Sequence, residues 1–388
     1  MGKFDIIAGI PSFNNEKTIS FVTRQIDAGL QRYHKKKRCL IINMDGGSTD
    51  DTTKKFLETN TITKKRVLIS PPGTTGKGTV LKLFFKESKI LEAKYNIIND
   101  SDLRSINPSW VKLQIDAIEK YKYDYATPIY NRYKYDGSIT KHICYPLIYG
   151  VFCKDIRQPI GGDFAFSRNA VDHWLKCKWS KNVNFFGIDI FMSANAILGK
   201  LKICQLLLGS KIHNVKDPAK TLSPMFRQVT DTLFTIITNN YEKLRELKKV
   251  KETKIIGRKK TKKVQKFSVD KEATEMRFKE GVIKNKGVIK KCLEKKDYNK
   301  LINMVKKDIE IENKWWAKII YDYIIAFKKN KRIRSLIIKS LVPIWFGRVY
   351  TFIEETQNIE TNKTEPLIKK QAKEFFKKRG YLLDRLRR

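Results

Sequence analysis

The N-terminal part of the chain alternates short apolar runs with stretches of helical spacing, and this alternation limits the folds open to it. Residues 18–33 place apolar side chains at helical intervals between the first two runs. Strands joined by a helix form right-handed units with parallel strands, so the loops that follow them meet at one edge of the sheet. The sequence therefore predicts an α/β fold with a Rossmann-like, mostly parallel sheet, whose strands include residues 4–10, 39–44, 66–70 and 95–100.

The fourth apolar run ends in two carboxylates, Asp100 and Asp102, which are separated by one residue. In a strand both would point the same way, so both can reach one Mg²⁺ or Mn²⁺ ion through oxygen atoms. Two carboxylates fill only part of the coordination shell of such a cation, and phosphate oxygens can fill the rest. The same pair also occurs as an ordinary solvated turn after a strand, so the neighbouring loops decide between the two interpretations.

Other loops at the predicted sheet edge contain residues suited to a nucleotide. The turn at residues 11–16 offers an aromatic face and amide groups to a base, and Asp45 can accept a hydrogen bond from a base N–H. Gly76, Lys77 and Gly78 stand at the start of a helix, where backbone N–H groups and an ammonium can approach phosphate. The chain has no Walker A pattern. Each loop alone can be an ordinary turn, but their joint occurrence favours a nucleotide site.

The composition favours a folded protein with anionic partners. Hydrophobic residues make up 41% of the chain, and 80 Lys and Arg residues against 40 Asp and Glu give a formal net charge of +40. Such a charge attracts nucleotides, phosphorylated substrates, anionic lipid surfaces and nucleic acids, although a compositional bias toward Lys would produce it as well. Charge alone therefore does not select among these partners.

The cysteines and the apolar stretches bear on the location of the chain. No C-x-x-C pair is present, so neither a zinc knuckle nor a disulfide framework is predicted, and a reducing cytoplasm fits. The first residues lack the pattern of a signal peptide. The longest apolar stretch, residues 336–353, is interrupted by Lys339, Pro343 and Arg348 and is not expected to span a membrane. We expect a cytoplasmic protein, with peripheral contact to the inner face of the membrane left open.

The loops follow one another in an order that resembles a known family. Residues 10–16, 45–50, 76–78 and 100–102 are similar to the successive nucleotide-sugar motifs of GT-A glycosyltransferases of the family 2 type. Later segments resemble the corresponding run of mannosylglycerate synthases and glucosyl-3-phosphoglycerate synthases, namely residues 132–140, 158–163, 186–189 and 211–213. Together these motifs cover roughly residues 5–228, and beyond them the chain resembles the family only in being helical and aromatic.

The resemblance implies a metal-dependent hexosyltransferase. Members of these families are retaining enzymes that make compatible solutes. Here a hexose would move from a nucleotide sugar, GDP-mannose or an NDP-glucose, to a small hydroxy acid such as D-glycerate or 3-phosphoglycerate. The implied cofactor is Mg²⁺ or Mn²⁺. The implied donor site consists of Pro11, Phe13, Asn15, Glu16, Asp45, Gly76, Lys77, Asp100 and Ser101.

The resemblance also implies the remaining ligands of the cation and the acceptor. His213 would join Asp100 and Asp102 as the third protein ligand of the cation. Arg132 with Thr140 would clamp the carboxylate of the acceptor, because a guanidinium binds a planar oxyanion through two hydrogen bonds. The implied acceptor site comprises Arg132, Asp136, Thr140 and Gly162.

The implied catalytic residues are Lys77, Asp163 and Asp189. Lys77 would stabilise the leaving diphosphate from the start of its helix. Either aspartate can act as a base, a transient nucleophile or a positioning group, and an inverting reaction would require one of them as the general base. Asp163 stands where these relatives usually carry Glu, so the choice of donor and acceptor stays open.

A change of character near residue 225 predicts two domains. Residues 1–225 would form the GT-A nucleotide-sugar-binding and catalytic domain, and residues 226–388 a smaller helical domain. Residues 248–266 contain ten basic residues and one acidic residue, which predicts a mobile, solvated loop or hairpin. The aromatic residues that follow recur at helical intervals, as in a packed helical core.

Two other classes of function remain open at this level. A glycosyltransferase acting on a lipid-linked or polysaccharide acceptor at the membrane surface would explain the basic loop through attraction to anionic headgroups. A nucleic-acid-binding protein would use the same charge, but the chain has no recognised DNA or RNA module, so no specific nucleic acid is expected. The oligomeric state is open, a homo-oligomer included.

Overall fold

The computed structural model describes residues 3–214, 222–258 and 264–387. The chain forms two compact units that interleave in sequence. The first unit comprises Met1–Asn131, Ile156–Asn214 and Thr253–Gln265, and the second comprises Arg132–Asp155, Val215–Glu252 and Lys266–Arg388. The predicted division into residues 1–225 and 226–388 differs from these units, because two short segments pack with the other part of the chain.

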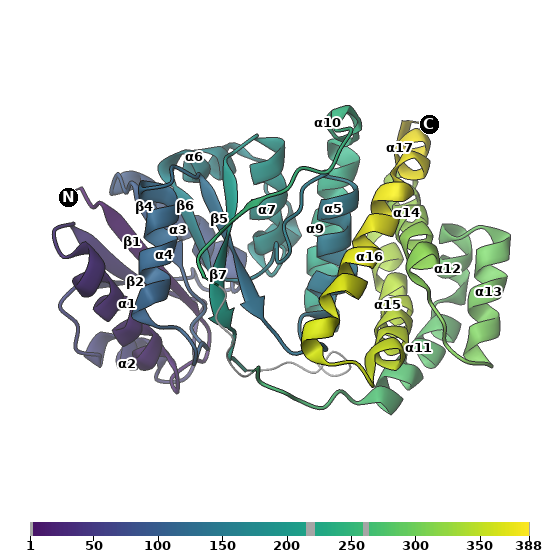
Figure 1. Ribbon diagram of the computed structural model, residues 1–388, viewed down its shortest axis with the longest axis horizontal. Coiled ribbons are helices and arrows are strands. Elements are labelled where there is room, and N and C mark those ends of the chain that lie inside the picture. Colours follow the sequence, from purple (N-terminus) through teal and green to yellow (C-terminus); the bar gives the residue numbers. More distant parts are fainter. Residues whose placement is uncertain (1–2, 215–221, 259–263, 388) are drawn as a thin grey trace. The chain divides into compact units, whose positions relative to one another are not determined.

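The first unit is built on one sheet, shown in Figure 1. Its order is β3-β2-β1-β4-β6-β5-β7-β8, and β6 runs antiparallel to both of its neighbours while the other pairs are parallel. The mostly parallel α/β sheet predicted from the sequence is therefore confirmed. Its strands are β1 (Ile6–Ser12), β2 (Cys39–Asp45), β3 (Lys64–Ile69), β4 (Tyr95–Ile98), β5 (Tyr125–Asn131), β6 (Phe164–Ser167), β7 (Ile203–Ser210) and β8 (Lys254–Ile256).

Helices cover both faces of this sheet because its central strands are apolar on both sides. In β1, Ile6, Ala8 and Ile10 pack in one core with apolar residues of α1 and α4. A Cβ on Gly9, between them, would lie 2.8 Å from the ring of Phe84 in α3, so the opposite face is covered closely as well. The helices of this unit are α1 (Ile19–His34), α2 (Thr52–Glu58), α3 (Lys77–Ile90), α4 (Pro108–Glu119), α6 (Arg168–Lys176), the short helix η2 (Lys181–Asn184) and α7 (Ile188–Leu198).

The basic segment predicted to be a solvated loop contains the edge strand β8. Residues 254–256 pair in parallel with β7, and Ile256 packs against the core of the first unit. Thr253 is buried beside the strand. The prediction of a solvated loop therefore does not hold for residues 253–256, because two isoleucines among the lysines suffice to extend the sheet. Residues 259–263 lie outside the described part of the chain.

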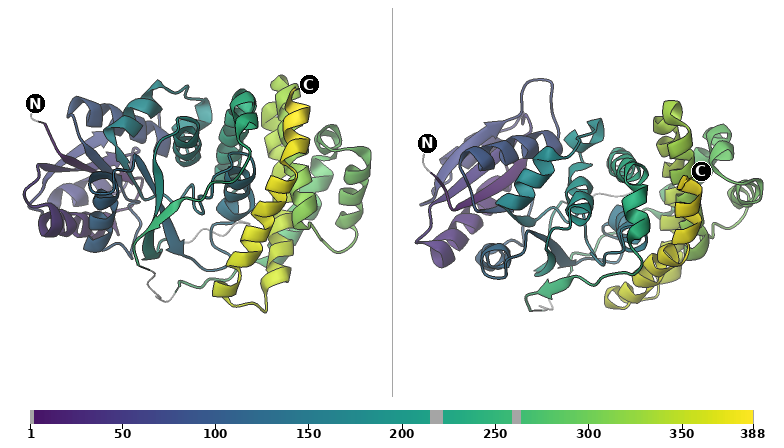
Figure 2. Two further views of the ribbon diagram at one scale, coloured as in Figure 1. Left: turned by 45° about the horizontal axis from the view of Figure 1, so that its top comes forward. Right: turned by 90° about the horizontal axis from the view of Figure 1, so that it is seen from above.

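The second unit is helical, and its helices pack side by side in Figure 2. A Cβ on Gly347 of α15 would lie 2.6 Å from the ring of Phe278 in α11, so these two helices cross closely. The ring of Trp345 lies 4.7 Å from that of Phe226. The helices are η1 (Thr140–Cys144), α5 (Tyr145–Gly150), α9 (Ser223–Asn239), α10 (Tyr241–Glu246), α11 (Lys271–Lys284), α12 (Lys286–Cys292), α13 (Lys295–Val305), α14 (Asn313–Lys329), η3 (Lys331–Ile333), α15 (Arg334–Thr356), η4 (Thr361–Lys363), α16 (Glu365–Lys377) and α17 (Arg379–Arg387).

The aromatic residues near the C-terminus form the core of the second unit, as their helical spacing predicts. Trp316, Tyr323 and Trp345 are fully buried. The helix Lys331–Thr356 is long and apolar enough to cross a membrane, but 83% of its most apolar window is buried within the protein. That environment is typical of a core helix.

Candidate active site

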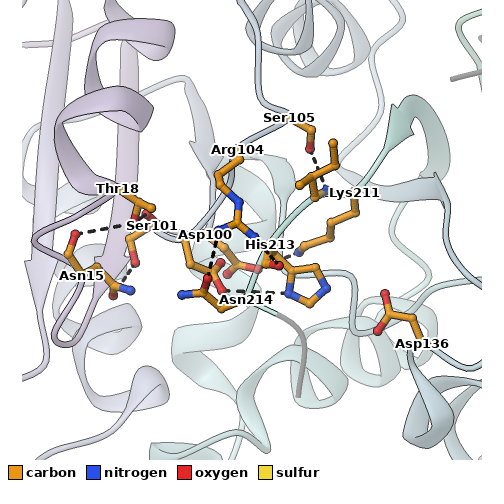
Figure 3. Close-up of polar contacts among 12 residues, drawn as sticks. Asn15, Thr18, Asp100, Ser101, Arg104, Ser105, Asp136, Lys211, His213 and Asn214 are labelled. Carbon is orange, nitrogen blue, oxygen red and sulfur yellow. Dashed lines mark hydrogen bonds and ion pairs between the residues drawn. The ribbon is translucent and has the colours of Figure 1, made fainter. Parts of the chain in front are cut away.

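The carboxylate of Asp100 lies between two ammonium groups, just beyond the end of β4. Lys77 Nζ is 3.1 Å from Oδ1 of Asp100, and Lys211 Nζ is 2.8 Å from Oδ2. Figure 3 shows Lys211 reaching toward Asp100 from the segment after β7. Burial raises the pKa of Asp100, but attraction to Lys211 and Lys77 outweighs it and leaves that pKa well below its ordinary value. Asp100 is therefore a carboxylate at neutral pH.

Lys211 also binds Asp163, which is fully buried next to β6. Its Nζ is 2.9 Å from Oδ2 of Asp163 and 2.8 Å from the carbonyl oxygen of Gly161. The hydroxyl of Tyr130 donates to the same Oδ2, and the backbone N–H of Asp100 donates to Oδ1 at 2.9 Å. Burial raises the pKa of Asp163, and Lys211 compensates for only part of this rise. Asp163 is thus held on both oxygens by the site itself.

Lys77 joins Asp100 to a third carboxylate, Asp189, in the first turn of α7. Lys77 Nζ is 3.1 Å from Oδ2 of Asp189. Burial lowers the pKa of Lys77, but Asp100 and Asp189 outweigh it and raise that pKa above its ordinary value. Burial raises the pKa of Asp189. The structure therefore brings the three predicted catalytic residues, Lys77, Asp163 and Asp189, together around Asp100.

The predicted cation ligands are only partly assembled. Asp102 Oδ2 lies 3.9 Å from His213 Nδ1, so a carboxylate and an imidazole face each other. Both oxygens of Asp100 instead bond to lysines. Within residues 3–214, 222–258 and 264–387, no three His, Cys, Asp or Glu side chains form a group that could hold a metal ion. Asp102 and His213 suit two positions in a shell of Mg²⁺ or Mn²⁺, whereas the predicted trio with Asp100 is not formed, because two ammonium groups occupy that carboxylate.

The segments that carry Asp102 and His213 are also joined by hydrogen bonds to Arg104 and Ser105, two residues that Figure 3 labels beside His213. The backbone N–H of Arg104 donates to the carbonyl of Ile212 at 2.9 Å, and the N–H of Ile212 donates to Ser105 Oγ at 3.0 Å. Arg104 Nη2 donates to the carbonyl of His213 at 3.0 Å. The loop after β4 and the segment after β7 are therefore tied at several points.

The first predicted donor loop is braced against the loop after β4. Asn15 Oδ1 accepts from the N–H of Phe13 at 2.9 Å and from Ser101 Oγ at 2.7 Å. The Phe13 side chain is 55% exposed, which leaves an aromatic face accessible at this edge of the sheet. Glu16 accepts a hydrogen bond from the backbone N–H of Asp51 at 3.4 Å. Phe13, Asn15, Glu16 and Ser101 thus lie together, as predicted for neighbouring loops at one sheet edge.

Asp45, predicted to contact a base, shapes its own loop. It is buried, and its Oδ1 accepts from the N–H groups of Gly47 at 2.8 Å and Ser48 at 2.6 Å. Its other oxygen accepts from the hydroxyl of Thr53. A contact between Asp45 and a nucleobase stays a prediction.

The glycines around Lys77 are required by the protein itself. Gly76 has φ of +145°, and a Cβ there would lie 2.4 Å from the carbonyl oxygen of Asn184. A Cβ on Gly78 would lie 1.7 Å from the carbonyl oxygen of Val183. The start of α3 therefore packs directly against η2. The sequence indicated these glycines only as an approach to phosphate, and this packing contact was not predicted.

Comparison with known proteins was informative only at the level of structure. No family model matches the chain, and no curated protein sequence matches it. Solved structures that match include glucosyl-3-phosphoglycerate synthase from Mycobacterium tuberculosis in complex with Mn²⁺, uridine diphosphate and glucosyl-3-phosphoglycerate, at 23% identity over 60% of this chain and 80% of that one, with a TM-score of 0.50. The Mg²⁺ and uridine diphosphate complex of that synthase matches at 23% identity over 60% and 79%, with a TM-score of 0.49.

The first unit has the GT-A fold. This confirms the fold class and the resemblance that the ordered loops indicated. In such a sheet ligands bind at the carboxyl ends of the strands, which is where Asp100, Lys211 and the predicted donor loops lie.

The predicted acceptor residues are divided between the two units. In the second unit, Arg132 Nη1 is 3.3 Å from Asp136 Oδ2, and a Cβ on Gly137 would lie within 4 Å of both Arg132 and Thr140. These predicted residues therefore share one turn at the start of η1. Gly162 belongs to the first unit, where its φ is +92° and a Cβ would lie 2.1 Å from Asp100 Oδ2. Gly162 is a glycine because Asp100 approaches its backbone so closely.

Lys211 and Tyr130 belong to the candidate site but were not predicted from the sequence. Lys211 is 5% exposed and bonds to two of the predicted site carboxylates. Its position carried a signal, because it is a single lysine directly after the apolar run of β7 and two residues before His213. Tyr130 gave no such signal, since its role depends on β5 lying beside β6.

Proposed function

We propose that this chain is a metal-dependent glycosyltransferase that moves a hexose from a nucleotide sugar to a small hydroxy-acid acceptor. The observation that carries the proposal is the pairing of Asp102 with His213 at 3.9 Å, at the ligand-binding edge of a GT-A sheet. A carboxylate and an imidazole leave room for the diphosphate oxygens of a donor on Mg²⁺ or Mn²⁺. When bound, the cation would offset the negative charge of the departing diphosphate.

The residues of the chain supply the rest of the donor site. The exposed ring of Phe13 provides a surface on which a base can stack. Lys77 begins α3, and its ammonium adds positive charge where the leaving diphosphate develops charge. Asp100 holds that ammonium at 3.1 Å, so Lys77 is oriented before a donor arrives.

The two candidate carboxylates differ in their availability to a sugar. Asp163 is fully buried and has both oxygens bonded within the site. Asp189 Oδ1 is buried and has no hydrogen-bond partner among the described residues. An unpaired buried oxygen is costly, so a donor hydroxyl would stabilise it. We therefore propose Asp189 as the carboxylate that faces the sugar. We also propose transfer with retention, as the resemblance to retaining enzymes implies.

We propose a small hydroxy acid as the acceptor. Arg132 and Thr140 remain the predicted clamp for the acceptor carboxylate, and D-glycerate and 3-phosphoglycerate are the acids to test first. The Mycobacterium tuberculosis synthase structure holds Mn²⁺, uridine diphosphate and glucosyl-3-phosphoglycerate, which supports the choice of a glucose donor among the probes.

The test is a panel of GDP-mannose, GDP-glucose, UDP-glucose and ADP-glucose with Mn²⁺ or Mg²⁺, read first by thermal shift. The donor that stabilises the chain is then incubated with D-glycerate or 3-phosphoglycerate, and the products are analysed. We expect one donor to raise the melting temperature only with metal and to yield a glycosylated acid. Absence of metal-dependent stabilisation by every donor contradicts the proposal.

A second candidate is a glycosyltransferase with a lipid-linked acceptor. It is favoured by an exposed basic surface on the second unit, where Lys284, Lys286, Lys290, Lys291, Lys295 and Lys296 are exposed. Ile283, beside this surface, is 47% exposed. Basic side chains next to an exposed apolar one suit an anionic membrane. Flotation with anionic but not neutral liposomes, together with transfer to a polyprenyl phosphate, would favour this candidate over a soluble acceptor.

A further inference from the structure

The two proposed cation ligands come from separate segments, and one buried lysine joins those segments. Asp102 follows Asp100 by two residues, and His213 follows Lys211 by two residues. The Lys211 ammonium binds Asp100 at 2.8 Å, so the bond links the two segments just ahead of both ligands. The Lys211 side chain is only 3% exposed.

We propose that Lys211 is a positioning residue that sets the separation of Asp102 and His213 before a donor binds. The inference rests on the proposed metal-dependent function. Lys211 does not bind the cation or the donor itself. It acts through Asp100 on one side and through its own backbone on the other.

The bonding of Lys211 fixes its ammonium in one place. An ammonium has three protons, and the carboxylates of Asp100 and Asp163 and the carbonyl of Gly161 accept at 2.8, 2.9 and 2.8 Å. The ring of Tyr130 lies 5.2 Å from the same nitrogen. A lysine with its donors satisfied and its side chain buried has little freedom to move, which suits a group that holds other residues in register.

The hydrogen bonds at Arg104 and Ser105 complete this connection. They join the backbone of Ile212 and the carbonyl of His213 to the loop after β4 at 2.9, 3.0 and 3.0 Å. These bonds would survive the loss of the Lys211 ammonium. We therefore expect a Lys211 variant to keep the two segments near each other but to lose the fixed separation of the ligands.

A purely structural role for Lys211 makes a different prediction. In that case the lysine would only neutralise Asp163 in the core, and removing both charges would restore the protein fully. In the positioning role, removing both charges restores stability but not cation affinity, because the bond from Lys211 to Asp100 that links the two segments is still missing. The double variant Lys211→Met with Asp163→Asn therefore separates the two roles.

The experiment measures Mn²⁺ binding to the full chain by electron paramagnetic resonance, with Mn²⁺ alone and with uridine diphosphate or guanosine diphosphate. Thermal unfolding of each variant is recorded in parallel. Lys65→Met serves as a matched control, because Lys65 donates to the carbonyls of Phe56 and Leu57 at 2.9 and 2.7 Å in the same unit but outside the site.

We expect Lys211→Met to weaken Mn²⁺ binding by about 10- to 100-fold, as for other residues that orient metal ligands. The double variant should regain thermal stability but keep the weak binding, and Lys65→Met should bind Mn²⁺ as the wild type does. Wild-type affinity in either Lys211 variant overturns the inference and leaves the proposed function intact. If the wild type binds no Mn²⁺ with any probe, the proposed function and the inference both fall. If Lys211→Met does not fold, the Mn²⁺ affinity of the double variant decides whether Lys211 positions the ligands.

Discussion

The two halves of the GT-A sheet contribute different things to the candidate site. The half formed by β3, β2, β1 and β4 ends in loops that present an exposed ring at Phe13 and the Asp102 carboxylate. The half formed by β6, β5, β7 and β8 contributes Asp163 and Lys211, both of which are buried. Under the proposed function, the first half would offer groups to a ligand, whereas the second would mainly hold those groups in place.

This difference predicts that substitutions in the two halves have different effects. His213 is the exception in the second half, since it reaches the ligand side through the segment after β7. Changes at the edge of the first half should act on chemistry with little effect on folding. Changes in the second half should act on stability and, through Lys211, on cation affinity.

The largest effect is expected for Asp102→Asn, at the edge of the first half. Loss of the carboxylate should weaken the hold on the cation and lower kcat/KM by about 1,000-fold, or about 4 kcal/mol of transition-state stabilisation. Thermal stability should change little, because the side chain is partly exposed. Steady-state kinetics with the donor found in the panel measure this effect. Asp116→Asn is the control, because the partly buried Asp116 lies on α4 and pairs with Lys112 rather than with the proposed cation ligands. Full activity of Asp102→Asn, or full activity in excess chelator, would exclude the metal site.

Arg132→Ala tests whether the acceptor depends on the turn that follows β5. The loss of a bidentate partner should lower kcat/KM for the acceptor, by an amount that corresponds to about 2–4 kcal/mol of transition-state stabilisation. Donor affinity should change little. Kinetics at saturating donor, with Arg332→Ala as an exposed control in the same unit, measure this effect. A collapse of donor affinity, or efficient transfer to a polyprenyl phosphate but none to glycerate, would contradict the hydroxy-acid hypothesis.

Gly78→Ala should break the close packing that holds Lys77 in place. The added Cβ would lie 1.7 Å from the carbonyl oxygen of Val183, so α3 and η2 must move apart. We expect a loss of about 2–3 kcal/mol in the free energy of unfolding, measured with urea. Gly287→Ala is the control, because a Cβ there meets no atom within 4 Å and alanine favours a helix. Equal stability of the two variants would show that this contact is not tight.

Ile256→Lys tests whether β8 belongs to the folded sheet. Ile256 packs against the core of the first unit, whereas its neighbour Ile255 is 49% exposed. The change at Ile256 should lower the free energy of unfolding by about 2 kcal/mol through the loss of buried apolar area. Ile255→Lys should change it much less. Indistinguishable urea midpoints for the two variants would show that this segment is a solvated loop, as its charge predicts, and not a strand of the sheet.

Three strands of the first half, β1, β2 and β4, could be predicted from the sequence because they are largely buried on both faces and appear as mostly apolar runs. The edge strand β3 is partly exposed, and its apolar residues Val67, Leu68 and Ile69 still indicated it. β1, predicted at residues 4–10, spans Ile6–Ser12, and β4, predicted at residues 95–100, spans Tyr95–Ile98. β5, β6, β7 and β8 were not among the four predicted strands. The shortest of them, β8, has three residues and carries almost no periodic signal of its own. Their strand conformation is set by pairing with neighbours that are distant in sequence.

The candidate site was predictable to the level of its loops but not of its internal bonds. Asp100, Lys77, Asp163 and Asp189 were each singled out from ordered motifs, and the structure brings them together. That Asp100 pairs with two lysines could not be predicted, because the geometry of Lys211 depends on where β7 ends relative to β4. The roles of the individual residues in donor and acceptor binding stay predictions.

The central claim is that a cation held by Asp102 and His213 binds the diphosphate of a nucleotide sugar. Calorimetric titration of uridine diphosphate and guanosine diphosphate into the full chain, with Mn²⁺ and again with excess chelator, tests it directly. We predict that one of the two nucleotides binds with Mn²⁺, that chelation weakens this binding by at least about 10-fold (about 1.4 kcal/mol), and that His213→Ala has the same effect in the presence of metal. Binding of equal strength with and without chelator, or unchanged metal-dependent binding in His213→Ala, would contradict the account.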